Sequence, residues 1–288
     1  MIPPSFDYHA PKTLPDALKL LAQHGDDAKV LSGGQSLLPL LKLRLASPAH
    51  VVDIGRIPGL DYIKEDGGLL RIGALVREAD LEASELVRTK YPILVDTASV
   101  VADPLVRNLA TVAGNLAHGD PANDHPATML ALGAEVVATG PKGQRTIPLA
   151  GFFKGLFTTV LEPNEILTEI RIPVPPAKSG GAYVKLERKV GDFATAGVAA
   201  FVVLDGAGAF QRAGIGLTSA GPSPVKAEAA EKHLIGKKAD AIGEAARLAA
   251  GAAAPGADRR GSVEYKKEMA RVLTVRALKK AYERAGGR

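Results

Sequence analysis

The sequence contains no cysteine and no tryptophan among its 288 residues. Without cysteine the chain cannot form disulfides, use a thiolate nucleophile, ligate zinc through sulfur or hold an iron–sulfur cluster by itself. Any iron–sulfur centre that serves this chain must therefore belong to a partner. No apolar run approaches the roughly 18 residues of a membrane span, and the first residues lack a basic segment followed by an apolar core. We therefore expect a cytoplasmic protein without a secretory signal.

Positively charged residues only modestly outnumber negatively charged ones. The chain has 36 Lys and Arg against 31 Asp and Glu, a net charge of +5 at pH 7, and the two signs are interspersed. This favours a solvated mixed surface over a nucleic-acid-binding face. Three signatures are also missing: G-x-G-x-x-G after a strand, the P-loop G-x-x-x-x-G-K-[ST], and a nucleophile elbow, because "GGQSLL" lacks the closing glycine. Rossmann-type binding, P-loop hydrolysis and serine esterase chemistry therefore have no support.

The first part of the chain, residues 1–56, predicts a small α/β unit. In "TLPDALKLLAQHG", Thr13 is a candidate helix N-cap with Asp16 three residues on, and Gly25 ends the helix. Apolar residues share one face of this helix: Leu14, Ala17, Leu18 and Leu21. The helix is followed by the strand "AKVL", the segment "SGGQS", a short apolar segment at 37–43 and the strand "HVVDI" at 50–54.

The rest of the chain predicts two further regions. Residues 57–177 read as an α+β subdomain, whose expected strands are 69–75, 134–140, 145–149 and 165–173 and whose expected helices are 78–88, 92–102 and 125–133. Prolines and glycines in "IPVPPAKSGG" mark a boundary. Residues 178–288 predict three antiparallel strands, "AYVKLERK", "TAGVAAFVVLD" and "AFQRAGIGLTSAG", followed by two or three helices from Pro224 on.

The segment "SGGQS", residues 32–36, is the first candidate binding loop. Gly33 and Gly34 permit positive φ and lack Cβ, so consecutive backbone N–H groups can point into one concavity and bind phosphate oxygens. The hydroxyls of Ser32 and Ser36 can assist. Glycine pairs are also common in plain turns, so this interpretation needs a second signal.

The second signal is "NLATVAGNLAHGDPANDHPA", residues 108–127. It shows no strong helix or strand period between Thr111 and Asp124, and long polar loops inside a domain tend to be functional. The Thr111 hydroxyl, the Asn115 amide and glycine N–H groups suit a diphosphate, and Asp124 could accept from a ribose or ribityl hydroxyl.

The same segment raises the possibility of a metal site, through His118, Asp120, Asp124 and His125. Neither H-E-x-x-H nor another close metal spacing is present, and such residues in a turn-rich loop are more often caps and surface groups. We therefore assign no metal ligand in this chain.

With both glycine loops in place, the sequence resembles the FAD-binding medium subunits of the molybdenum hydroxylases, the xanthine dehydrogenase family. "SGGQSLLPLLKLR" is similar to the family's first flavin loop, usually A-G-G-[HQ]-S, and "TVAGN" to its second, usually T-[IV]-G-G-N. "IPPSFDYH", "GDPANDHPA", "EIRIPVPP" and "KVGDFATA" are similar to the carbon monoxide dehydrogenase branch. The resemblance covers essentially the whole chain. It implies an α+β fold, a vanillyl-alcohol-oxidase-like FAD-binding domain pair plus a C-terminal three-stranded sheet with helices, and FAD between the first two domains.

The resemblance also implies which residues contact FAD. Those on the diphosphate side would be Ser32, Gly33, Gly34, Gln35, Ser36, Thr111, Ala113, Gly114 and Asn115. Asp124 would hold flavin hydroxyls, Leu167 and Lys185 would line the flavin, and Phe193 would cover the ring. By residue type alone, Phe193 is more often a core residue and Lys185 a solvated surface charge.

Three positions depart from the family pattern. Phe193 stands where the carbon monoxide branch has tyrosine, so the apolar cover is kept and the hydroxyl is lost. Ser32 replaces alanine, and Ala113 replaces glycine. Alanine is acceptable at position 113 only if the backbone there has negative φ.

The resemblance finally implies an electron-transfer subunit with no catalytic acid, base or nucleophile of its own. A large partner would carry the molybdenum cofactor, a small partner two [2Fe–2S] clusters, and FAD on this chain would pass electrons to an acceptor such as quinone. An (αβγ)2 complex, bound at most peripherally to the inner face of the membrane, is expected. Carbon monoxide is the expected substrate. Because this subunit does not touch substrate, an aldehyde such as glyceraldehyde, a purine or an N-heteroaromatic such as nicotine stays open, as do a stand-alone flavin oxidase and a non-catalytic scaffold.

Overall fold

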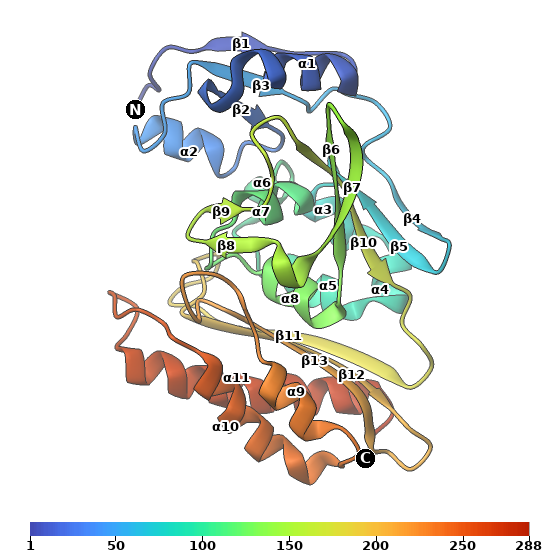
Figure 1. Ribbon diagram of the computed structural model, residues 1–288. Coiled ribbons are helices and arrows are strands. Elements are labelled where there is room, and N and C mark those ends of the chain that lie inside the picture. The colour runs from blue at the N-terminus through green and yellow to red at the C-terminus, as the bar shows by residue number, and fades with distance from the viewer. Residues whose placement is uncertain (288) are drawn as a thin grey trace.

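The computed structural model describes residues 1–287 and shows three sheets that follow one another from the N-terminal to the C-terminal end of the molecule (Figure 1). Their strand orders are β1-β3-β2, β4-β5-β10-β6-β7 and β11-β12-β13-β14, and a two-stranded sheet pairs β8 with β9. The two chain ends lie at opposite ends of this arrangement. Within residues 1–287, no helix has both the length and the apolar character that crossing a membrane would require.

The first sheet contains the helix and the two strands that the sequence predicts, and also a strand, β1, that was not expected. Its elements are β1 (Asp7–His9), α1 (Leu14–His24), β2 (Ala28–Leu31), α2 (Leu37–Lys42) and β3 (His50–Asp53). Thr13 caps α1 by accepting a hydrogen bond from the Asp16 N–H, and Gly25 ends the helix with φ of 54°. Both β1 and β2 pair parallel with β3. Ala17 and Leu21 of α1 pack on Val52 of β3 in a small core.

The second sheet carries most of the helices. Its strands are β4 (Ile63–Asp66), β5 (Leu69–Gly73), β6 (Glu135–Gly140), β7 (Gly143–Pro148) and β10 (Ile166–Pro173), and β8 (Phe153–Gly155) and β9 (Thr158–Thr159) lie beside it. Its helices are α3 (Glu78–Ala83), α4 (Glu85–Lys90), α5 (Pro92–Ala98), α6 (Pro104–Arg107), α7 (Val112–His118) and α8 (His125–Leu132). The single helix expected at 78–88 is wrong. Ser84, with ψ of 119°, ends α3 and caps α4 by accepting from the Val87 N–H.

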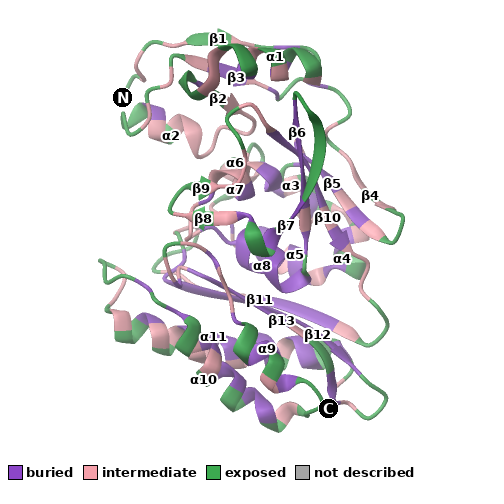
Figure 2. Ribbon diagram, in the orientation of Figure 1, coloured by how far each residue is buried: buried purple, intermediate pink, exposed green. Residues whose placement is uncertain are grey.

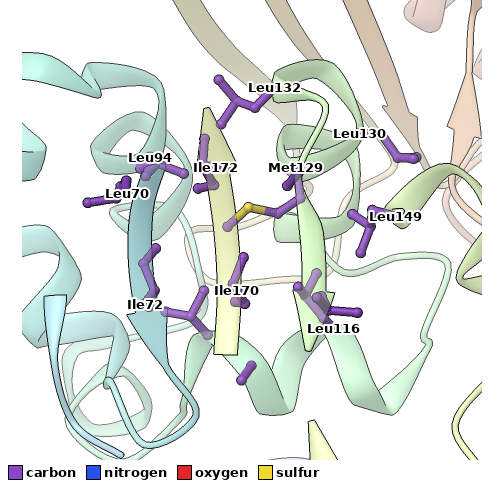
Figure 3. Close-up of a cluster of buried hydrophobic side chains, with 14 of the residues drawn as sticks. Leu70, Ile72, Leu94, Leu116, Met129, Leu130, Leu132, Leu149, Ile170 and Ile172 are labelled. Carbon is purple, nitrogen blue, oxygen red and sulfur yellow. The ribbon is translucent and has the colours of Figure 1, made fainter. Parts of the chain in front are cut away.

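An apolar core joins this sheet to its helices. Leu70 and Ile72 of β5 and Ile170 and Ile172 of β10 are fully buried. Figure 3 shows Met129 of α8 reaching over the sheet face that the β10 residues present. This core fixes α8, and with it the turn that precedes α8, against the sheet.

The third sheet is buried on both faces. Its strands are β11 (Ser179–Leu186), β12 (Ala196–Leu204), β13 (Phe210–Thr218) and β14 (Val225–Lys226), followed by α9 (Glu228–Leu234), α10 (Ile242–Ala252) and α11 (Val263–Arg284). Every residue of β12 is buried (Figure 2). One face of β12 presents Ala199, Phe201 and Val203 to the core of the second sheet. The other face presents Val198 and Val202 to the core under the three helices. Alternation between two apolar environments explains why this strand reads as one apolar run.

Candidate functional site

The two glycine-containing segments meet in the structure. Residues 32–36 follow β2, and the hydroxyl oxygens of Ser32 and Thr111 lie 3.1 Å apart. A Cβ on Gly33 would lie only 2.1 Å from the carbonyl oxygen of Leu109, so only glycine lets the backbones approach this closely. Gly34 has φ of 76°, which an L side chain rarely adopts. The backbone therefore brings together two segments that are 79 residues apart.

The second segment contains a helix that the sequence analysis missed. No helix was expected between Thr111 and Asp124, but α7 occupies Val112–His118. Thr111 caps it by accepting from the Gly114 N–H at 3.2 Å, and Gly119 ends it in the left-handed region. Ala113 is buried inside this helix and has no positive φ, so the condition for tolerating alanine is met.

A cavity of about 360 Å³ adjoins the two segments at the carboxyl ends of β2 and β3. Ser32, Gly33 and Thr111 line it. Charged residues that the sequence analysis did not foresee also line it, namely Arg56, Asp61, Arg77 and Asp80. The signal for Arg56 was available, because "GRIPGL" directly follows a strand and ligands gather at the carboxyl ends of parallel strands.

Asn115 connects α7 to the turn before α8. Its backbone oxygen accepts from the Asn123 amide at 2.8 Å. Its side-chain oxygen is buried and has no hydrogen-bond partner among residues 1–287. Because buried polar atoms are normally paired, this amide has a free position that fits a ligand hydroxyl or, after rotation of the amide, a phosphate oxygen.

Asp124 is buried against the third sheet. The Tyr183 hydroxyl donates to its Oδ1 at 2.5 Å, and Lys185 Nζ donates to its Oδ2 at 3.0 Å and to the Val100 carbonyl at 2.9 Å. Only 3% of the Lys185 side chain is exposed, so the interpretation of Lys185 as a solvated surface charge is wrong. Burial raises the pKa of Asp124, while the Lys185 ammonium and the Tyr183 hydroxyl oppose that rise. Burial and Asp124 raise the pKa of Tyr183.

The remaining predicted site residues lie in different surroundings. Leu167 is buried in β10 and belongs, with Ala113, to the apolar core of the second sheet. Phe193 lies between β11 and β12 and is 50% exposed, so the expectation of a core position is wrong. Gln35 donates to the Gly33 carbonyl at 3.2 Å, and Ser36 precedes α2 without a side-chain capping bond.

The polar residues at the facing ends of α7 and α8, and Asp120 between these helices, have separate partners. His125 is fully buried with its Nε2 2.6 Å from Glu78 Oε2, and Asp120 accepts from the Ala122 N–H. His118 packs on Phe157 with ring centroids 5.0 Å apart, and burial lowers the pKa of His118. Asp120 makes a turn contact, whereas His125 lies in the core rather than at the surface, where such residues were expected.

Two family models match the chain. The "FAD binding domain in molybdopterin dehydrogenase" matches residues 4–175, and the "CO dehydrogenase flavoprotein C-terminal domain" matches residues 181–281. The carbon monoxide dehydrogenase medium chain of Hydrogenophaga pseudoflava is 46% identical over 286 residues, 99% of each chain. The medium chain of the same name from Afipia carboxidovorans is 45% identical, again over 99% of each. A solved carbon monoxide dehydrogenase structure from H. pseudoflava superposes with a TM-score of 0.96 at 48% identity, over 99% of each chain.

Proposed function

Because this chain belongs to the FAD-binding medium subunits of the molybdenum hydroxylase family, we propose that it is the flavin-carrying electron-transfer subunit of a carbon monoxide dehydrogenase. The family and the α+β fold expected from the sequence are confirmed. Support for carbon monoxide comes from two medium chains of carbon monoxide dehydrogenases that match over 99% of this chain. FAD suits such a role because it accepts electrons singly or in pairs.

The observation that carries the flavin assignment is the contact between the two glycine segments. Gly33 leaves no room for a Cβ beside Leu109, and Ser32 and Thr111 share a hydrogen bond. Ser32 and Gly33 of the first segment and Thr111 of the second therefore line the same cavity, and hydroxyl and backbone N–H donors of this kind suit a diphosphate. The free side-chain oxygen of Asn115 supplies a further position for a ligand. The residues present thus fit FAD.

In this proposal the diphosphate is held by residues 32–36 and by Thr111, Ala113, Gly114 and Asn115. Asp124 holds flavin hydroxyls, and Lys185 neutralises and orients the Asp124 carboxylate through the 3.0 Å contact. Leu167 and Phe193 supply apolar cover. We also propose that the chain divides into domains at 56/57 and 177/178, with the third sheet in the last domain.

The partners belong to the same proposal. A large subunit would hold the molybdenum cofactor and a small subunit two [2Fe–2S] clusters, in an (αβγ)2 complex. The chain contains no cysteine, so it relies on a partner for iron–sulfur centres. Quinone is the proposed acceptor, reached by peripheral association with the inner face of the membrane.

Anaerobic absorption spectra of the natively purified complex test the function. Carbon monoxide should bleach the flavin and iron–sulfur bands. If dithionite bleaches them and carbon monoxide does not, the substrate is wrong and glyceraldehyde, purines and nicotine are tested next. A complex without stoichiometric, reducible FAD would refute the flavin role and leave a scaffold. Activity of the isolated chain without partners would instead indicate a stand-alone oxidase.

A further inference from the structure

Three histidines meet in the first sheet, at the opposite end from the glycine segments. His9 ends β1, His24 is the last residue of α1, and His50 begins β3. The parallel register pairs Asp7 with His50 and His9 with Val52, so these side chains share the face of the sheet that α1 covers. The C-terminal end of α1 then brings His24 over that face. None of the three contributes to the flavin site described above.

The ring nitrogens of the three histidines lie near the distances of a metal-ligand set. His9 Nε2 is 3.2 Å from His50 Nδ1. One ring nitrogen from each of the three histidines lies within 4.8 Å of the others. The rings of His24 and His50 are 3.6 Å apart between centroids. In a tetrahedral zinc site with Zn–N bonds of about 2.0–2.1 Å, neighbouring nitrogens are about 3.3–3.4 Å apart. Small rotations of partly exposed side chains would therefore bring all three nitrogens onto one ion.

A carboxylate lies beside the cluster. Asp7 Oδ2 is 3.6 Å from His50 Nδ1, and the Asp7 side chain is 77% exposed and therefore able to move. Among residues 1–287, the three rings make one side-chain hydrogen bond, which joins His9 and His50. Ring nitrogens thus remain available for an ion. All three imidazoles are partly exposed, so an ion can reach them from solvent.

We propose that His9, His24 and His50 bind a divalent transition-metal cation with Asp7 as the fourth ligand. Imidazole prefers Zn²⁺, Cu²⁺ and Ni²⁺ over the hard cations Mg²⁺ and Ca²⁺, and three histidines with one carboxylate suit tetrahedral Zn²⁺. This assignment departs from the expectation, drawn from sequence spacing, that the chain holds no metal. The site lies outside the flavin proposal, so either can fail without the other.

The consequence of metal binding would be structural. The four ligands come from β1, from the end of α1 and from β3, the elements that enclose the small core of Ala17, Leu21 and Val52. Small cores gain most from a cross-link of this kind. A bound ion would hold the end of α1 against both strands and stabilise the first sheet, by an amount that grows with the logarithm of the free ion concentration above its Kd.

The test uses the purified full-length chain after removal of metal with a chelator. Zn²⁺ is titrated in competition with a chromophoric chelator, and thermal unfolding is followed with and without Zn²⁺. We expect one Zn²⁺ per chain and a higher Tm in its presence. His24→Gln should weaken binding at least about tenfold, since even outer partners of ligands contribute 10–100-fold, and should reduce the Tm shift. His9→Gln combined with His50→Gln should abolish binding.

His233→Gln is the matched control, because His233 lies on α9 of the third sheet's helices, far from the cluster in the fold. The proposal would be overturned if His233→Gln weakened Zn²⁺ binding as much as His24→Gln does. It would also be overturned if His24→Gln bound Zn²⁺ as tightly as the wild-type chain. Co²⁺ added to the wild-type chain gives a reading that needs no variant. Its visible bands, at wavelengths longer than flavin absorption, should appear with one equivalent and disappear when one equivalent of Zn²⁺ is added. Absence of those bands would also overturn it.

Discussion

Gly33 and Gly214 both depend on a missing Cβ, and the structure uses the close approach differently at each. At Gly33 a Cβ would lie 2.1 Å from the Leu109 oxygen, and at Gly214 of β13 it would lie 1.9 Å from the Ala131 oxygen of α8. The first contact joins two polar segments beside a cavity. The second presses a buried helix onto a buried strand. Close backbone approach therefore does not identify a binding site by itself.

Hydrogen-bonding capacity distinguishes the two places. Around Gly33 stand the hydroxyls of Ser32 and Thr111 and, one helical turn on, the unpartnered amide oxygen of Asn115. The Gly214 contact lies among apolar residues of α8 and the third sheet. We expect changes at the Gly214 contact (the packing side of the comparison) to lower stability, and changes at the Gly33 contact (the polar side) to lower flavin affinity. The buried pair of Asp124 and Lys185 is the exception, because it is polar and should also contribute to stability.

The largest effect is expected for Lys185→Met. This change leaves the buried Asp124 carboxylate without its ammonium partner, and breaking a buried ion pair from one side typically costs about 3–5 kcal/mol. Denaturant unfolding of the flavin-free chain measures the loss. The double variant Asp124→Asn with Lys185→Met removes both charges and should recover part of it. A double variant as unstable as the sum of the single changes would contradict this account.

The same variant has an expected pH dependence. Burial already raises the pKa of Asp124 above its ordinary 3.8, and Lys185 opposes that rise. Removing Lys185 should raise this pKa further. A carboxyl whose pKa is higher in the folded state favours folding most below its ordinary value, and that contribution is lost as pH rises through the raised pKa. The deficit of Lys185→Met should thus be larger at pH 8 than at pH 5, and equal deficits would argue against a charged Asp124.

Gly214→Ala tests the packing side of the comparison. The added methyl group would meet the Ala131 carbonyl, so α8 must shift, and overpacking of this kind costs about 1–3 kcal/mol. Gly206→Ala is the control, since a Cβ there meets nothing within 4 Å. We expect lower unfolding midpoints for Gly214→Ala and unchanged FAD affinity in the fraction that folds. A large loss of FAD affinity at full stability would erase the distinction between the two glycines.

Gly33→Ala tests the polar side. Its Cβ would collide with the Leu109 carbonyl and push apart the segments that carry Ser32 and Thr111. We expect FAD to bind at least about tenfold more weakly, which corresponds to about 1.4 kcal/mol, with a smaller loss of stability than in Gly214→Ala. Fluorescence titration of the flavin-free chain measures the affinity. Gly151→Ala, where a Cβ is unobstructed, should bind FAD as the wild-type chain does.

Much of this architecture could be predicted from local patterns. Thr13 and Gly25 bound α1 as expected, and the family and fold followed from two glycine segments at the expected separation. The helix α7 was missed because it has seven residues, too few for a 3.6-residue period to stand out among the polar residues that follow it. A helix this short gains its stability from tertiary packing rather than from its own sequence.

Features made by tertiary contact could not be predicted. The exposed fraction of Lys185 depends on Asp124 and Val100, which precede it by 61 and 85 residues. The histidine cluster combines three segments with no motif spacing, and only the parallel register of β1 and β3 together with the end of α1 brings the rings together. Exposure of Phe193 likewise contradicts the average behaviour of phenylalanine.

Ala113→Gly is the smallest expected effect and the sharpest check on how the second segment works. Family members usually carry glycine at this position, so a strained alanine would predict tighter FAD binding in the variant. Here Ala113 lies inside α7 with its side chain buried and without positive φ. Glycine would then relieve nothing and would cost about 0.5–1 kcal/mol of stability as a helix residue. We expect unchanged FAD affinity by fluorescence titration and a slightly lower unfolding midpoint. Tighter binding would mean that the segment must leave its helical geometry to bind the flavin.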